Sequence, residues 1–195
     1  MKLLTRSFTN TEWLLRDPAD MKSEVSLYTY GHNFFTTEEC DYWMDVIESN
    51  YSIEQATLVS QDIDRSTRST GTRISQVAWL TSGIDVIQPL YKKLVDAVNN
   101  HNNTFFKFNL TSIETLQYTI DDSNVSKQSR YDWHVDEAFT NNPLNLIRKL
   151  SFVLLLTNPS NFTGGNLDLW CDNQLITVNL KQGSIVFFHH HYSTA

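Results

Sequence analysis

The segment Tyr131-Asp132-Trp133-His134-Val135-Asp136 has the composition of a short β-strand and carries an imidazole and a carboxylate two residues apart. Side chains at positions i and i+2 of a strand point to the same face of a sheet. His134 and Asp136 can therefore converge on one point, while Val135 turns to the other face and packs there.

Such a pair can supply two of the three protein ligands of a metal ion. Two imidazoles and one carboxylate form the facial triad that is the usual platform for non-haem Fe(II) oxygenases. The third ligand has to be a histidine far along the chain, and the sequence carries His189, His190 and His191 near its end. The alternative interpretation of His134 is a strand histidine satisfied by a local hydrogen bond, with Asp136 at the end of the strand.

Composition limits the class of protein. A chain of 195 residues suits one domain with a real core. The net charge of −7 argues against a nucleic-acid or anionic-membrane surface, because such surfaces need excess Lys and Arg. We find no apolar run long enough for a membrane span, no apolar leader, and two cysteines, Cys40 and Cys171, too few for a disulfide framework. We therefore expect a cytoplasmic protein that binds neither nucleic acid nor membrane.

The first part of the chain carries two helix signals. Thr36 and Glu39 have the spacing of a capping box, and an apolar stripe follows at Cys40, Trp43, Met44 and Ile47. A second stripe runs from Ile87 to Val98, and its helix has to begin near Pro89, because proline is tolerated only in the first turn. Strands are expected within residues 26–35 and 74–80.

The second part of the chain reads as a series of short strands. We expect six of them, at residues 112–120, 131–136, 150–157, 167–171, 174–179 and 184–188. Many short strands in succession favour a β-sandwich or barrel, of which the jelly roll is one form. The run Leu150–Leu156 is nearly continuous in apolar residues, as in a central strand covered on both faces.

Five blocks, taken in order, resemble the prolyl 4-hydroxylase-type 2-oxoglutarate/Fe(II) dioxygenases. They are Leu116-Gln117-Tyr118, Tyr131–Asp136, Arg148-Lys149-Leu150-Ser151, Gly164-Gly165-Asn166-Leu167 and Gly183–Phe188. Each block is unspecific alone, and their order makes the resemblance specific. The resemblance implies an α+β, mainly β fold, a double-stranded β-helix (jelly roll) with N-terminal supporting helices. One domain would cover residues 1–195, with the support at 25–110 and the jelly-roll core at 111–188.

The resemblance also assigns roles to residues. His134 and Asp136 match the iron-binding pair, and Tyr118 matches a tyrosine that contacts 2-oxoglutarate. The other interpretation of Tyr118 is a core aromatic whose hydroxyl finds a local partner. Arg148 and Lys149 would begin a strand with solvated charges and no catalytic role.

Cofactors and partners follow from the same resemblance. They are Fe(II), 2-oxoglutarate as co-substrate, ascorbate as an optional reductant, and a peptide or protein substrate. The paired glycines Gly164 and Gly165 would support a turn that needs positive φ. The sequence does not indicate an oligomeric state.

The chain departs from the family pattern after Phe188. In the family, this strand is followed by Pro-Ser, the distal iron ligand, and then a Lys or Arg that pairs with the far carboxylate of 2-oxoglutarate. Here His189–Ala195 follow, with no Lys or Arg beyond Lys181, so we expect the last strands of the sandwich to be missing. Three explanations compete: a shortened enzyme with His191 as the third metal ligand, a domain that has lost turnover, or an incomplete or frame-shifted coding sequence.

The leading hypothesis is an Fe(II)- and 2-oxoglutarate-dependent dioxygenase that hydroxylates an unactivated C–H bond, with succinate and CO2 as co-products. Peptidyl proline is the typical target of the family. The competing hypothesis is a non-catalytic jelly-roll binding module or an inactive truncated dioxygenase domain. A zinc hydrolase and a serine hydrolase are disfavoured because the sequence has neither an HExxH nor a Gly-x-Ser-x-Gly motif.

Overall fold

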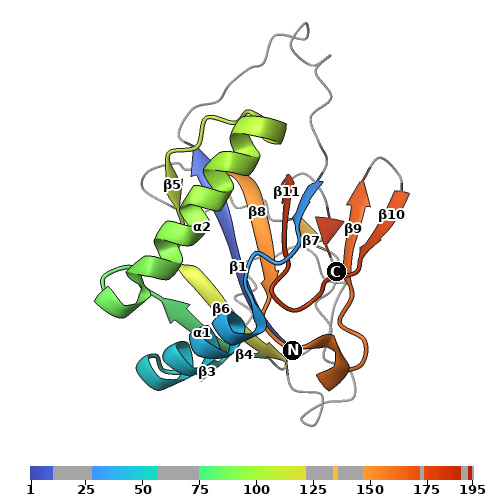
Figure 1. The fold of residues 1–195 in the computed structure, drawn as a ribbon. Coiled ribbons are helices and arrows are strands. Elements are labelled where there is room, and N and C mark those ends of the chain that lie inside the picture. The colour runs from blue at the N-terminus through green and yellow to red at the C-terminus, as the bar shows by residue number, and fades with distance from the viewer. Residues whose placement is uncertain are drawn as a thin grey trace, which may run out of the picture.

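The protein, as a computed structural model, is described here over residues 1–10, 28–56, 75–121, 134–135, 147–171, 174–189 and 193–194. Within these residues, two antiparallel sheets and two α-helices make up the fold (Figure 1). The larger sheet has the strand order β2 (Tyr28–Gly31), β11 (Ile185–His189), β8 (Ile147–Leu155), β1 (Lys2–Asn10), β6 (Leu116–Asp121), β4 (Ser75–Leu80) and β3 (Glu54–Gln55), and β5 (Ser112–Ile113) pairs with β1. The smaller sheet has the order β10 (Gln174–Val178), β9 (Leu167–Cys171), β12 (Ser193–Thr194) and β7 (His134–Val135).

The larger sheet is covered on both faces, because it lies between the helices and the smaller sheet. Figure 1 shows α1 (Thr37–Asn50) and α2 (Gln88–His101) on one side of this sheet and β9 and β10 on the other. Two apolar clusters fill the layers. The helix-side cluster includes Leu4, Leu154 and Phe187, and the inter-sheet cluster includes Val153 and Val186.

Both helices form where the sequence predicts them. Thr36 caps α1: its hydroxyl accepts from the Glu39 N–H at 3.2 Å, and the Glu39 carboxylate accepts from the Thr36 N–H at 2.9 Å. Pro89 stands in the first turn of α2, where its missing N–H costs no helical bond. The short 3-10 turn Asp85–Ile87 precedes α2, and a π-helical turn, Asn102–Phe106, follows it.

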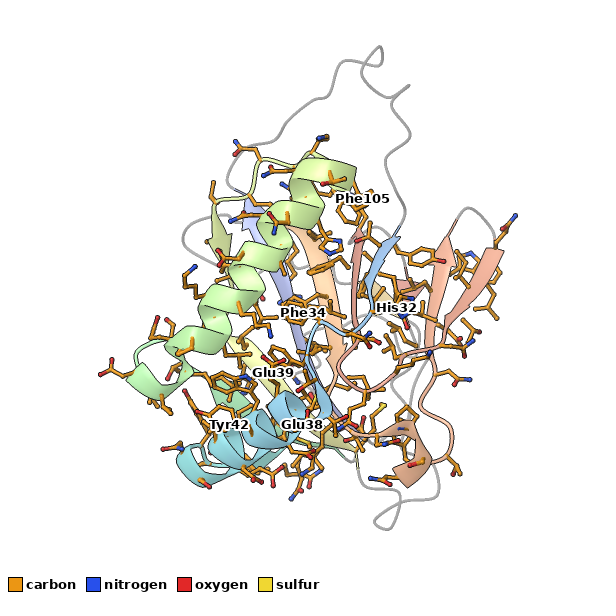
Figure 2. All side chains as sticks on the ribbon, in the orientation of Figure 1. His32, Phe34, Glu38, Glu39, Tyr42 and Phe105 are labelled. Carbon is orange, nitrogen blue, oxygen red and sulfur yellow. The ribbon has the colours of Figure 1, made fainter. Side chains whose placement is uncertain are left out.

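An ion pair links the two helices next to Phe35. Lys93 of α2 donates to the Glu39 carboxylate of α1 at 2.7 Å, and its ammonium lies 4.3 Å from the ring centre of Phe35. Figure 2 shows Glu39 and Phe34 close to each other in this region. The hydrogen bond from Lys93 and the bond from the Thr36 N–H hold the pKa of the Glu39 carboxyl below its ordinary value.

The central strand β1 is not predicted from the sequence, and neither are the short strands β3 and β12. It pairs with β8 on one side and with β6 on the other, and Leu4 is completely buried. The Met1 ammonium donates to the Asp121 carbonyl at 2.8 Å, which fixes the end of the pairing with β6. The first residues of the chain therefore lie inside the sheet and not before it.

The other predicted strands are present in the described residues, and one more follows them. Residues 150–156 are all buried and lie in or next to β8, as expected for a strand covered on both faces. After β11 the chain forms β12 in the smaller sheet, so the prediction that the last strands are missing is wrong for this strand. The centre of the larger sheet is filled by β1.

Glycines stand at the turns where positive φ is needed. Gly164 and Gly165 have φ of +77° and +69°, which confirms their expected structural role. Gly183 has φ of +75°, and a Cβ added there would lie 2.0 Å from the Phe35 carbonyl oxygen. The close approach allows the Phe35 N–H to donate to the Gly183 carbonyl at 3.0 Å.

Candidate metal centre

Strand pairing brings several strand ends together at one end of the sandwich, which we call the His134 end. Ser193 of β12 pairs with Val135 of β7, and three residues separate Ser193 from His189 at the end of β11. The Cα atoms of His189 and Ser193 therefore lie within about 15 Å of each other. The first residues of β8 lie beside the end of β11, because His189 pairs with Leu150 in an antiparallel register.

His134 occupies a register position that faces the interior of the sandwich. Thr194 pairs with His134 and also with Leu169, and Leu169 pairs with Ile176. Leu169 and Ile176 both belong to the inter-sheet cluster. The neighbouring row contains Val135 and the exposed Trp170, which is 46% accessible. Since alternate rows of a sheet face opposite sides, the row of His134 is the interior one.

The other two expected metal ligands, Asp136 and His191, lie outside the described residues. Among the residues that are described, no group of three His, Cys, Asp or Glu side chains lies close enough to hold a metal ion. β7, which carries His134, and β12 are hydrogen-bonded neighbours.

Of the three terminal histidines, His189 lies within the described residues, and its contacts place it on one side of the larger sheet. Its ring centre lies 4.9 Å from that of Phe108, a residue packed against the helix-side cluster. Its partner in β8 is Leu150, which belongs to the same cluster. His189 is therefore engaged on the helix side of the larger sheet and is not on the side that faces β7.

Tyr118 is also on the helix side. It shares a row with Leu4 and Leu154, and all three belong to the helix-side cluster. Its hydroxyl donates to a carboxylate oxygen of Glu48 on α1, and Lys2 donates to the same oxygen. The contact with 2-oxoglutarate that the resemblance implies is not supported by this position, whereas the alternative, a core aromatic with a local hydroxyl partner, fits the observed contacts.

Burial and hydrogen bonding shift the pKa values of Tyr118 and Glu48 in opposite directions in the cluster that they form with Lys2. Burial raises the pKa of the Tyr118 phenol, and the Glu48 carboxylate raises it further, so the phenol keeps its proton and donates. Burial alone would raise the pKa of the Glu48 carboxyl, but the hydrogen bonds from Lys2 and Tyr118 outweigh it and lower that pKa. These residues anchor β1 and β6 to α1.

Arg148 and Lys149 begin β8 at the His134 end. Arg148 donates two hydrogen bonds to the Glu114 carboxylate, both at 2.9 Å, and both side chains are about three-quarters buried or more. The expectation that the charge of Arg148 remains solvated is therefore wrong. Lys149 is half-buried.

A separate depression lies at the opposite end of the sandwich. It has a volume of about 380 Å³ and is lined by Lys2, Asp41, Asn158, Asn161 and Gln182, among others. Lys2 begins β1, and Asn158 follows the end of β8, so both stand at the end away from His134. No helix in the described parts of the chain is long and apolar enough to cross a membrane.

Comparison with known proteins agrees with this geometry. Residues 119–194 match the family model of the 2OG-Fe(II) oxygenase superfamily. A PKHD-type hydroxylase of Synechococcus sp. (strain CC9311) is 33% identical over 66 residues, which is 34% of this chain and 29% of the relative. The match thus spans less than a third of the relative's length.

The fold has a solved counterpart as well. A prolyl-4-hydroxylase of Pseudomonas putida superposes with a TM-score of 0.56 at 18% identity, covering 90% of this chain and 87% of the other. The similarity confirms the predicted jelly-roll fold. The three comparisons together confirm the resemblance to the prolyl 4-hydroxylase-type 2-oxoglutarate/Fe(II) dioxygenases.

Proposed function

We propose that this chain binds Fe(II) through His134, Asp136 and His191 and uses 2-oxoglutarate as co-substrate to hydroxylate a C–H bond of a peptide or protein. The observation that carries the proposal is the row of His134, which it shares with the interior residues Leu169 and Ile176. A metal held there would lie at the end of the sandwich, between the two sheets. Two imidazoles and one carboxylate suit Fe(II) and leave coordination positions for other ligands.

The iron, once bound, would supply the oxidising chemistry: one oxygen atom of O2 enters the substrate as a hydroxyl, and the other enters succinate as 2-oxoglutarate loses CO2. The residues of the chain have the tasks of holding the donor atoms in place and limiting access of water. The apolar inter-sheet cluster, with Val153, Val186 and Phe188, would exclude water from the side of the metal that faces the inside of the sandwich. The name of the Pseudomonas putida neighbour, a prolyl-4-hydroxylase, favours a prolyl group as the target.

The test is succinate formation by the purified chain. The protein is incubated with Fe(II), 2-oxoglutarate and ascorbate, with and without proline-rich peptides, and compared with His134→Ala. Exposed His32 provides the matched control, since His32→Ala should leave the rate unchanged. Succinate above the His134→Ala level supports the proposal.

The competing function is a jelly-roll module that binds a partner without turnover. It becomes the better account if wild-type chain and His134→Ala produce the same succinate while both remain folded. Metal binding without succinate would indicate an inactive domain of the same type.

A further inference from the structure

We propose that β10 pairs with the β10 strand of a second copy of this chain, so that the two smaller sheets join into one across a two-fold axis. β10 stands at one end of the strand order of the smaller sheet, and within the described residues it pairs with β9 alone. Figure 1 shows β10 at the margin of the molecule. A strand in this position directs one set of backbone N–H and C=O groups away from its sheet, where another strand can bind them.

The register of β10 against β9 shows which backbone groups point outward. Cys171 and Gln174 are partners with two residues between them in the sequence. The pair that flanks such a short connection exchanges both of its hydrogen bonds, and the pattern repeats at every second residue, so Ile176 also bonds to β9. Leu175 and Thr177, which are both exposed, therefore direct their N–H and C=O groups away from β9.

β10 lacks the features that protect an exposed sheet edge from other chains. Protected edges are very short, carry charged side chains or proline, or are interrupted by a bulge. The sequence of β10 is Gln-Leu-Ile-Thr-Val, with neither a charge nor a proline, and its register with β9 is continuous. By contrast, β3 at one edge of the larger sheet is two residues long and carries the carboxylate of Glu54. β10 is thus open to a further strand in a way that β3 is not.

The order of residues along β10 suits a second copy of the same strand. In the antiparallel register that aligns the whole strand, Ile176 lies on the two-fold axis opposite Ile176 of the second copy, and Leu175 lies opposite Thr177 of the second copy. This register brings the outward backbone groups of the two strands together. It gives about four hydrogen bonds, two from each such pair.

The side chains on the outer face of the smaller sheet support the same arrangement. Leu175 is 54% exposed and pairs with Trp170 of β9, which is 46% exposed. In the symmetric dimer the two Leu175 side chains become diagonal neighbours, so each covers part of the other. The net charge of −7 places no carboxylate on β10 itself. The carboxylate of Asp168 on β9 accepts from the Thr177 hydroxyl at 2.6 Å, so it has a partner within its own copy.

The first experiment measures the mass of the full chain by sedimentation velocity at increasing protein concentration. Two short edges bury a small area, so the dimer should be weak, and the mass should rise from 22.6 kDa toward twice that value only at high concentration. Leu175→Lys should weaken the association at least about tenfold, because the charge enters the interface twice and the two ammonium groups lie diagonally across the axis. Tyr42→Lys is the matched control, since Tyr42 is 53% exposed on α1, and it should associate like the wild type. Circular dichroism checks that both variants are folded.

Amide hydrogen exchange on the wild-type chain reports on the edge directly and needs no substitution. The N–H groups of Leu175 and Thr177 should exchange at least about fivefold more slowly in the dimer than in the dilute monomer, whereas the N–H of Ile176, which bonds to β9, should change little. A mass that stays at one chain, a dimer in which these two amides are not protected, or a folded Leu175→Lys variant that associates like the wild type would overturn the proposal. Protection that appears in a monomeric chain only after an extended peptide is added would assign the edge to another partner and overturn it as well.

Discussion

Replacing Tyr118 with phenylalanine separates the two roles that the sequence allows for this residue. The substitution removes one hydroxyl that donates to the Glu48 carboxylate and leaves the buried ring in place. A hydrogen bond to a charged group contributes about 1.5–3 kcal/mol. The Glu48 side chain is 35% exposed and keeps its bond from Lys2, so we expect the lower figure, about 1.5 kcal/mol.

The loss is measurable by thermal and urea unfolding. For a chain of this size, about 1.5 kcal/mol corresponds to a fall in Tm of about 3–6 °C. Tyr42→Phe is the matched control, because Tyr42 lies on α1, the helix that carries Glu48, and is 53% exposed. This substitution should change the free energy of unfolding by less than about 0.5 kcal/mol. The affinity for 2-oxoglutarate should be unchanged in Tyr118→Phe.

The effect should also depend on pH. The pKa of the Glu48 carboxyl is lowered in the folded protein, so the stabilisation is complete above its unfolded pKa of about 4.3 and is lost as the pH falls through the folded value. The difference between wild type and Tyr118→Phe should therefore shrink below about pH 4. A tenfold loss of 2-oxoglutarate affinity with unchanged stability would refute the structural role and restore the role as a co-substrate contact.

Two further predictions test the fold that positions the site. Leu4→Ala should lower the free energy of unfolding by about 2–5 kcal/mol, because Leu4 is completely buried at the centre of the larger sheet, whereas Leu175→Ala, at a 54% exposed position, should have little effect in the same urea titration. Equal effects would contradict the central placement of β1. Gly183→Ala should cost more than about 3 kcal/mol, since its φ is positive and the added Cβ would meet the Phe35 carbonyl, while Gly83→Ala has open space around it and should be neutral. A neutral Gly183→Ala would show that this turn differs from the one described.

Local signals in the sequence predict the helices well. The Thr36 capping box and the position of Pro89 are satisfied by contacts within one turn, so no distant residue is needed to find them. β8 is predictable for a similar reason, because its continuous apolar run requires cover on both faces. The positions of these elements can therefore be predicted from residues within them or next to them.

β1 and Tyr118 show where the sequence is insufficient. Residues 2–10 mix charged, polar and apolar side chains without a clean period, and only their pairing with β6 and β8 makes them a central strand. Tyr118 and its neighbour Gln117 differ by one position of register, and that position decides which faces the helices. A family motif names the residue type but does not fix this register.

The start of β8 also shows the limit of a local pattern. The sequence predicts solvated charges at Arg148 and Lys149, but the Arg148 guanidinium is largely buried against the Glu114 carboxylate, 34 residues earlier in the chain. The bulge opposite Phe8 and Thr9 could not have been foreseen, since it depends on the pairing of β8 with β1. Long-range pairing therefore supplies the information that the local pattern lacks.

The most direct test of the central claim is a crystal structure of the chain grown with Mn²⁺ and 2-oxoglutarate, with anomalous scattering used to locate the metal. We predict an anomalous peak between the two sheets at the His134 end, with an imidazole nitrogen of His134 and a carboxylate oxygen of Asp136 as ligands. A structure of the folded chain with no peak there, or with a metal that His134 does not contact, would contradict the account.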